Sequence, residues 1–530
     1  MIRPGTSRTD TFAALDNDFD VLIIGGGATG LGIAVDAVTR GYRTALAEAG
    51  DFAQATSSRA TKLVHGGVRY LASGQIHLVY EALHERAIMV RNAPHLVHPL
   101  PFIIPANHAY ELPYYGAGLK LYDLLSGKAT LGPTKILGRQ ATLARIPGLK
   151  PEHLSGGILY HDGQFNDARL ALALARTAAD HGAIIANYTR CIRLIHTGGR
   201  VTGAVVRDLE TGAERSIRAK TVMNATGIFV DEIRRMDEPE RPSLLSVSRG
   251  SHIVVSKDVL GGRESGLEAK TAFMVPKTDD GRVIFAIPWQ GRVVIGTTDI
   301  PATNSEVEPG HTEAEIDYLL ELANLYLARP IDRLDILSVF SGLRPLVTGK
   351  SATTSRLSRE HHIDTSANGL ITVAGGKWTT YRRMAEDTLD FAIKQGALPT
   401  LKSVSGSIAL RGATTSEDIS DPYLREYGTD APAIVALITA DPSLGQTIDP
   451  ALPYTFAEVA YAVREEMART LEDVLSRRTR ALLLDAKAAI RAAPEVAALM
   501  SAELGQTPEW QQTQVSAFLQ LARTDYLLQA

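Results

Sequence analysis

The sequence predicts an α/β fold in which a Rossmann-like dinucleotide-binding domain carries an antiparallel β substrate-binding subdomain and is followed by an α-helical domain. A glycine-rich strand–turn–helix pattern over residues 20–48, alternating apolar residues over about 242–345 and helical periodicity after residue 399 lead to this expectation. Residues 1–19 are expected as an N-terminal extension, 20–398 as the nucleotide- and substrate-binding domain, and 399–530 as the C-terminal helical domain.

The nucleotide-binding expectation rests on the first strand and the turn after it. The apolar run 21–24 leads into a G-x-G-x-x-G spacing, which lets a pyrophosphate approach a helix N-terminus. The residues of this turn are Gly25, Gly27, Ala28, Thr29 and Gly30. The next strand, 44–47, ends in Glu48, whose carboxylate would accept hydrogen bonds from a ribose and repel a 2′-phosphate. FAD or NAD is therefore expected rather than NADP.

Composition and charge exclude several classes of protein. The 530 residues carry 55 Lys+Arg against 59 Asp+Glu, a net charge of −4, so no global positive field favours nucleic acid. The single cysteine, Cys191, excludes an internal disulfide and a cysteine zinc cluster, and no metal site is predicted. Neither a signal peptide nor a membrane-spanning helix is expected from the sequence, although the protein could lie on a membrane surface.

A segment rich in hydroxyl groups and glycines follows Glu48. Hydroxyl side chains and free backbone N–H groups suit a pyrophosphate, and a glycine pair lets a flat ring lie against the main chain. The candidate residues are Thr56, Ser57, Ser58, Thr61, Lys62, His65, Gly66 and Gly67. On these residues alone, an ordinary surface loop is the alternative interpretation.

Six motifs resemble the FAD-dependent glycerol-3-phosphate dehydrogenase family. In chain order they are G-G-G-A-T-G, S-S-R-A-T-K-L-V-H-G-G-V-R-Y-L, G-S-H-I-V-V, I-G-T-T-D, S-G-L-R-P-L and G-G-K-W-T-T-Y-R. The resemblance runs from about Asp20 into the C-terminal helices. It implies FAD as the cofactor and glycerol 3-phosphate as the substrate, with hydride transfer from C2 to flavin N5 and electrons passed to quinone.

The resemblance also assigns cofactor residues beyond the first turn. Ala225, Thr226 and Gly227 are expected near the adenosine half, and Cys191 is counted with them although it otherwise fits a small buried residue. The strand and glycine pair over 372–376 precede a helix start that would face flavin N1, where reduction places negative charge. This adds three cofactor residues, Gly376, Lys377 and Thr379.

Substrate residues are expected on the alternating strands of 242–345. A single histidine on a strand is more often structural than catalytic, but the match of His252 to G-S-H-I-V-V favours a base. Arg344 and Lys377 complete the expected catalytic set, and the proton could instead leave through Lys377 or water. The expected phosphate binders are Arg69, Tyr70, Arg344, Arg359 and Lys377. The acidic residues of 156–170 are assigned structural roles.

Residues 113–128 combine aromatics and leucines with Lys120 and Lys128. They fit either an interfacial helix at a membrane surface or a helix packed on the core. The family resembles peripheral membrane enzymes that reduce quinone, so the cytoplasmic face of a bacterial inner membrane, or the cytoplasm, is the expected location.

The C-terminal region reads as helices over 421–427, 431–440, 456–475, 477–492 and 507–528. Thr455 and Glu458 form a predicted capping box at the third of them. This domain would cap the substrate channel or meet a partner, and a homodimer stays an open expectation. Two alternatives for the whole protein are a glycerol-3-phosphate oxidase that uses O2, and a flavin-fold RNA-modifying or RNA-binding protein.

Overall fold

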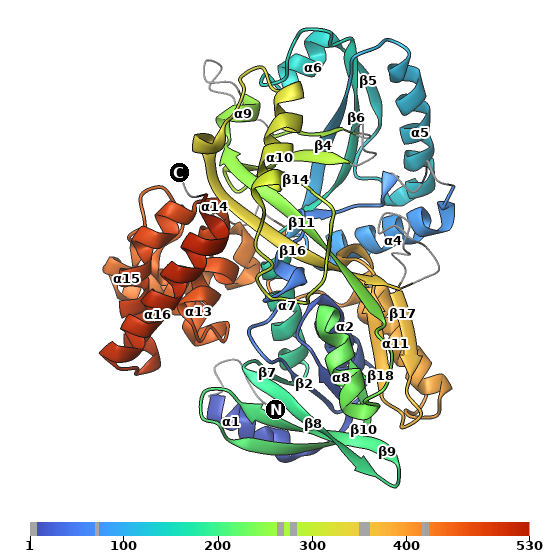
Figure 1. The fold of residues 1–530 in the computed structure, drawn as a ribbon, viewed down its shortest axis with the longest axis vertical. Coiled ribbons are helices and arrows are strands. Elements are labelled where there is room, and N and C mark those ends of the chain that lie inside the picture. The colour runs from blue at the N-terminus through green and yellow to red at the C-terminus, as the bar shows by residue number, and fades with distance from the viewer. Residues whose placement is uncertain are drawn as a thin grey trace.

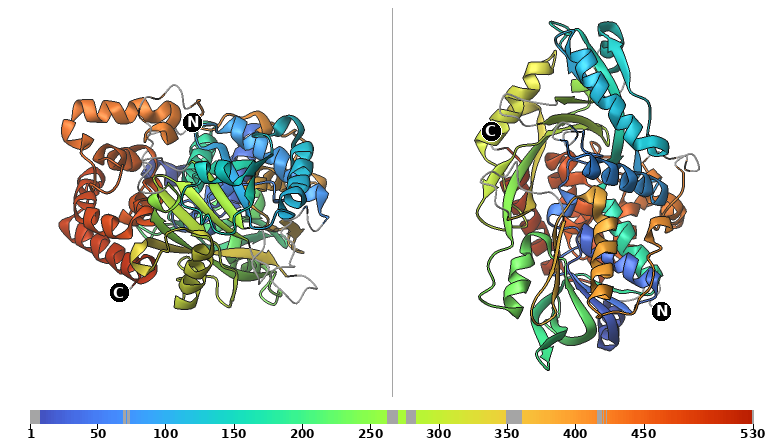
Figure 2. Two further views of the ribbon diagram at one scale, coloured as in Figure 1. Left: turned by 90° about the horizontal axis from the view of Figure 1, so that it is seen from above. Right: turned by 90° about the vertical axis from the view of Figure 1, so that its right-hand side faces the viewer.

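The computed structural model describes residues 8–68, 71, 74–261, 270–275, 283–348, 361–415, 419, 421 and 423–528. Two sheets follow each other along the long axis of the molecule, and helices from the end of the chain cover one side of it (Figure 1). Seen from above, these C-terminal helices lie on the side opposite the early blue helices (Figure 2).

The first sheet contains the predicted nucleotide-binding strand. Its eight strands are β1 (Asp18–Ile24), β2 (Thr44–Ala47), β7 (Ile184–Ala186), β8 (Thr189–Thr197), β9 (Arg200–Asp208), β10 (Glu214–Asn224), β17 (His361–Thr365) and β18 (Ile371–Gly375). The order is β17-β18-β10-β1-β2-β7, in which the five strands from β18 to β7 are parallel. Parallel strands are covered on both faces, which explains the uninterrupted apolar run of β1.

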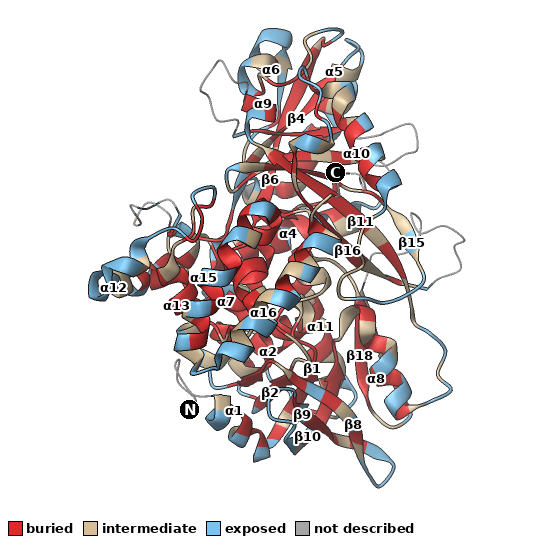
Figure 3. Cartoon of the chain, turned by 60° about the vertical axis from the view of Figure 1, so that its left-hand side comes forward, coloured by how far each residue is buried: buried red, intermediate tan, exposed pale blue. Residues whose placement is uncertain are grey.

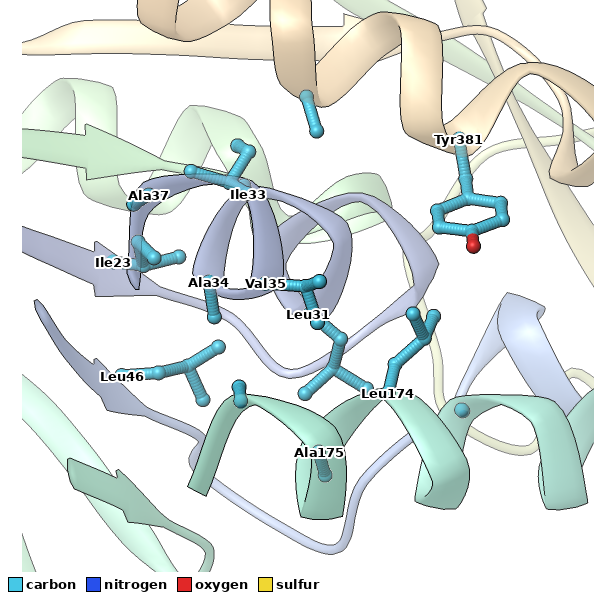
Figure 4. Close-up of a cluster of buried hydrophobic side chains, with 14 of the residues drawn as sticks. Ile23, Leu31, Ile33, Ala34, Val35, Ala37, Leu46, Leu174, Ala175 and Tyr381 are labelled. Atoms are coloured by element: carbon cyan, nitrogen blue, oxygen red, sulfur yellow. The ribbon is translucent and has the colours of Figure 1, made fainter. Parts of the chain in front are cut away.

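Helix α2 (Ala28–Arg40) fixes the position of the glycine turn by packing against two other helices, α7 (Asp167–Asp180) and α11 (Tyr381–Lys394). Figure 4 shows Leu31 of α2 pointing toward Leu174 of α7, with Tyr381 of α11 nearby and Ile23 of β1 on the sheet side. The N-terminal extension also packs on the first sheet: Phe12 and Leu15 are buried, and Arg8 donates a hydrogen bond to Asp208 at 2.6 Å.

The second sheet is larger than the sequence predicts. Its ten strands are β3 (Leu63–Val64), β4 (Val97–Ala106), β5 (Lys135–Gly138), β6 (Gly156–Phe165), β11 (Leu245–Ser256), β12 (Ala272–Val275), β13 (Ile284–Trp289), β14 (Arg292–Gly296), β15 (Ile300–Ala302) and β16 (Ile336–Val347). The expected limits of 242–345 therefore miss the four strands from residues 63–165. All pairs are antiparallel except β4 with β12.

The sequence did not predict strand β4, because its prolines are unusual within a strand. Strand β4 pairs with β6 over its full length, and Pro99, Pro101 and Pro105 are among the paired residues. All three lie at odd-numbered positions, so the missing N–H donors belong to one edge of β4, and the even-numbered residues keep theirs. On its other side β4 pairs with β12 only at Phe102 and Ile103.

Helices cover the outer faces, where Figure 3 shows exposed residues over buried strands. Two of these helices are α4 (Ile76–Asn92) and α10 (Glu313–Tyr326). The others in this part are α5 (Glu111–Ser126), α6 (Arg139–Arg145), α8 (Val230–Asp237) and α9 (Asp258–Gly261).

The C-terminal domain is helical as predicted, with different bounds. Its main helices are α12 (Ala431–Ala440), α13 (Phe456–Glu465), α14 (Ala481–Leu484), α15 (Ala486–Leu504) and α16 (Pro508–Leu521), with a 3-10 turn at Arg425–Asp430. The predicted helix 456–475 is interrupted over 466–470, where Met467 adopts a positive φ of 57°, and helical structure resumes at Leu471. The predicted single helix 477–492 is instead three helical pieces: it breaks at Arg480, which has φ 61°, and again at Asp485, whose side chain caps the start of α15.

Candidate active site

The glycine turn between β1 and α2 has the form that the spacing predicts. Gly25 has φ 112°, and a Cβ there would lie 2.6 Å from the carbonyl oxygen of Ala225. A Cβ on Gly30 would overlap the carbonyl oxygen of Gly25. Gly27, the N-cap of α2, brings no side-chain acceptor to the helix start. The turn therefore requires glycine and leaves a helix N-terminus at which an anion can bind.

A cavity of about 1,050 Å³ opens at this turn. Predicted cofactor residues that line it are Gly25, Gly27, Ala28, Thr29, Glu48, Thr56, Ser57, Cys191, Ala225, Thr226, Gly227, Gly376 and Lys377. Most of these residues lie at or just beyond the ends of β1, β2, β10 and β18, which meet because neighbouring parallel strands end at the same edge. Thr56 and Ser57 lie in a 3-10 turn farther along the chain, and Cys191 lies on β8. The cavity is large enough for a dinucleotide.

Glu48 lies where β2 ends, with its carboxylate bound to the main chain. Its two oxygens accept hydrogen bonds from the N–H groups of Gly26 at 2.5 Å and Gly50 at 2.7 Å. Burial raises the pKa of Glu48, and these N–H groups act against that shift. An ionised carboxylate has further lone pairs beyond these two bonds, so acceptance from a ribose hydroxyl is compatible with this position.

Cys191 lies on β8 and lines the cavity as a buried residue. Burial raises the pKa of its thiol to about 11. The side chain is therefore a protonated, small, apolar part of the wall rather than a nucleophile.

The other predicted cofactor residues lie behind the cavity lining. Lys62 is fully buried and donates to Asp167 at 2.6 Å. The N–H of His65 donates to the Thr379 hydroxyl at 3.2 Å, and the N–H of Gly66 donates to Tyr122 at 2.8 Å. Within the described residues, Gly30, Ser58, Thr61, Lys62, His65, Gly66, Gly67 and Thr379 are not part of the lining.

His252 lies on β11 opposite Gly296 of β14 and Phe340 of β16. Its ring stacks on Phe340 with centroids 4.6 Å apart, and a Cβ on Gly296 would overlap the imidazole. Nε2 lies 3.0 Å from the Thr61 hydroxyl. Burial lowers the pKa of His252 well below its usual range, and the charges of Lys62 and Arg344 lower it further. The imidazole is therefore neutral near pH 7, which is the protonation state that a proton acceptor needs.

Arg344 lies on β16, beside Pro345, which lines the cavity. Nη1 donates to Asp299 at 3.1 Å, and Nη2 donates to the hydroxyl of Thr297 and the carbonyl of Thr298, both at 2.9 Å. These contacts fix the plane of the guanidinium. The I-G-T-T-D motif contains all three partners, but the sequence did not indicate that they hold this arginine.

Three of the predicted phosphate binders, Arg69, Tyr70 and Arg359, lie outside the described residues. Sequence reasoning also missed Glu308, which lines the cavity and pairs with Arg59. Burial raises the pKa of Glu308 to about 7. No local pattern marks it, because its partner lies some 250 positions earlier in the chain.

Comparison with known proteins gives consistent matches. Residues 20–382 match the family described as "FAD dependent oxidoreductase", and residues 370–514 match the "C-terminal domain of alpha-glycerophosphate oxidase". The mitochondrial glycerol-3-phosphate dehydrogenase of Mesocricetus auratus is 42% identical, over 98% of this chain and 75% of that protein. Glycerol-3-phosphate dehydrogenase 2 of Mycobacterium bovis is 39% identical, over 97% and 89%.

Solved structures agree with these relatives. The glycerol-3-phosphate dehydrogenase from Bacillus halodurans complexed with FAD superposes with a TM-score of 0.80 at 30% identity, covering 98% of each chain. The L-alpha-glycerophosphate oxidase of Mycoplasma pneumoniae has a TM-score of 0.57 at 17% identity, covering 73% of this chain and 96% of that one. At that identity the second match shows the fold alone.

Proposed function

Because this chain belongs to the FAD-dependent glycerol-3-phosphate dehydrogenase family, we propose that it oxidises glycerol 3-phosphate to dihydroxyacetone phosphate and passes the electrons to a quinone. FAD is the cofactor, as the sequence predicts. The glycine turn and the cavity at the strand ends suit its pyrophosphate and its length.

The position of segment 56–61 carries the proposal. Thr56 and Ser57 line the cofactor cavity, and the Thr56 hydroxyl donates to the carbonyl of Leu343, the neighbour of Arg344, at 2.7 Å. A few residues later Thr61 contacts His252. One short segment therefore joins the cavity, the candidate base and the candidate phosphate-binding arginine, as removal of a hydride from C2 and of a proton from its hydroxyl requires.

The residues of this chain would divide the reaction as follows. His252 is the acceptor of the C2 hydroxyl proton, and Nε2 would exchange its contact with the Thr61 hydroxyl for one with the substrate. Arg344 and Lys377 bring positive charge to the substrate phosphate, together with Arg69, Tyr70 and Arg359 as the sequence suggests. FAD, when bound, supplies the hydride acceptor.

Helix α5 supports a membrane surface as the place where quinone is met. Leu119 and Tyr122 pack on the core, whereas Tyr114 and Leu124 are 71% and 76% exposed. The helix is thus apolar on both faces, which an ordinary surface helix is not. Among the described helices none is long and apolar enough to cross a bilayer. Peripheral attachment at the inner face of a bacterial membrane is our proposal for this protein.

Anaerobic flavin reduction tests the function. The purified yellow protein is mixed with glycerol 3-phosphate without oxygen, and loss of flavin absorbance is the expected result. A quinone analogue or air is then added. Faster recovery with the quinone analogue supports the dehydrogenase, faster recovery in air makes the protein an oxidase, and no bleaching overturns the substrate assignment.

A further inference from the structure

Four consecutive residues of the C-terminal domain, Arg477–Arg480, enter the interior of the nucleotide-binding domain. The three arginines of this run, Arg477, Arg478 and Arg480, are each 1% exposed. A π-helical turn, Asp473–Arg478, and the positive φ of Arg480 direct the run inward. Arginine is rarely buried this deeply unless its donors are used, so the partners of the run indicate its role.

The run contacts both ends of one short segment. At the first end, Asp51 accepts from Arg477 Nε at 2.5 Å and from Arg478 Nη2 at 3.0 Å. At the other end, the carbonyl of Ser58 accepts from Arg480 Nη2 at 2.6 Å. Arg480 also pairs with Asp167 at 3.1 Å.

The residues between these ends form part of the cofactor cavity. Ala53, Gln54, Ala55, Thr56 and Ser57 all line it. The Ser57 hydroxyl accepts from the N–H of Ala28, the first residue of α2, at 3.0 Å. The same segment thus completes the helix start at which the pyrophosphate is expected.

At the Arg480 end of the run, charge balance argues against stability as the purpose of this arrangement. Lys62 and Arg480 share the carboxylate of Asp167, so two basic side chains face one acidic one in a fully buried place, and burial lowers the pKa of Lys62 to about 7. Burial lowers the pKa of Arg480, because keeping this cation out of water costs free energy. Buried ion pairs commonly add little net stability, while they fix geometry closely.

We propose that Arg477, Arg478 and Arg480 are positioning residues that hold segment 51–58 in its cofactor-binding form, so that the C-terminal helical domain is part of the FAD site. This role goes beyond the proposed reaction, because it concerns cofactor binding and requires no particular substrate.

FAD titration of the apoprotein tests the role. Arg480→Met keeps most of the side-chain volume and removes the donor to Ser58, and Arg478→Met does the same at Asp51. Each is expected to raise the Kd for FAD by about tenfold or more, since a charge-assisted hydrogen bond to the segment is lost. Arg464→Met and Arg491→Met are matched controls, because these exposed arginines of the same domain pair with Glu503 and Asp449. They should leave the Kd within about twofold.

Thermal unfolding separates positioning from a general loss of stability. If Arg480 positions the segment, FAD should raise the Tm of Arg480→Met by less than it raises the Tm of the wild type. The Tm of the apoprotein should differ much less between the two. Arg480→Lys keeps the charge beside Asp167 and should give an intermediate Kd, which keeps the test available if the methionine variant does not fold. An unchanged Kd in the folded variants, or equal destabilisation of apo and FAD-bound protein, overturns the proposal. Failure of glycerol 3-phosphate to bleach the wild-type flavin leaves this result unaffected.

Discussion

At the scale of single residues, the surroundings of His252 determine which reaction step it can serve. Its neutral ring has Nε2 beside the Thr61 hydroxyl, and its face rests on Phe340. His252→Gln keeps a polar group of similar size and removes the proton acceptor. We expect the rate of anaerobic flavin reduction by glycerol 3-phosphate to fall by roughly 10²–10⁴-fold, the usual contribution of a general base. Stopped-flow absorbance measures it.

The control for His252 is His181→Gln at an exposed position. It should reduce flavin at the wild-type rate, and FAD affinity should be unchanged in both variants. A His252→Gln protein that reduces flavin at close to the wild-type rate would assign the proton to Lys377 or to water instead.

Local patterns indicated the residue types of the site but not their partners. His252, Arg344 and Lys377 lie in motifs that can be read from the chain. Phe340, which stacks on His252, and Asp299, which pairs with Arg344, come from other elements. A pairing between two residues a hundred positions apart is set by sheet register, and no sequence spacing encodes register between distant strands.

At the scale of elements, the first turn tolerates no side chain at Gly30. A methyl group there would overlap the Gly25 carbonyl oxygen, so the turn must move away from its cofactor-binding form. Gly30→Ala is expected to weaken FAD binding by about 100-fold or more, roughly 3 kcal/mol. Titration of the apoprotein with FAD measures this. Gly118→Ala in α5, where a Cβ meets nothing within 4 Å, should bind FAD normally.

Helix starts were easier to predict than helix ends. The capping box of Thr455 and Glu458 is present at the start of α13 as predicted. The end at Glu465 was missed because the following residues keep helical periodicity while Met467 turns to positive φ. Side-chain caps are local and can be read from sequence, whereas a break imposed by packing has no local signal.

The same capping residue gives the fold a pH dependence. Burial raises the pKa of Glu458 from its ordinary 4.5 to about 7, so the folded state holds a proton that the unfolded state releases between these values. Its contribution to stability is fully present below pH 4.5 and is lost as the pH rises through 7. It amounts to on the order of 3 kcal/mol.

Glu458→Gln removes this titration. The unfolding free energy of the wild type minus that of the variant should be larger at pH 5 than at pH 8, as chemical denaturation at both pH values would measure. Glu495→Gln, at an exposed position of α15, is the matched control and should change the unfolding free energy little. A pH-independent difference for Glu458→Gln would contradict the assignment.

At the scale of the whole molecule, its two opposite sides have different roles. The C-terminal helices cover one side and reach the cofactor segment with buried arginines, while α4 and α5 lie on the opposite side (Figure 2). Tyr114, Leu121 and Leu124 lie at i, i+7 and i+10 on α5, which places them on one exposed face. Exposed apolar residues that follow one helical face suit a lipid surface, with Lys120 beside them for lipid phosphates.

The double variant Tyr114→Glu, Leu124→Glu tests this face. Two carboxylates should repel an anionic bilayer and remove the apolar contact, so vesicle binding should weaken by about tenfold or more. Reduction of a water-soluble dye by glycerol 3-phosphate should be unchanged, whereas reduction of a quinone embedded in the vesicles should fall with binding. Leu334→Glu, at a leucine 85% exposed outside α5, serves as the control and should affect neither. If the double variant sediments with vesicles like the wild type, another surface meets the membrane.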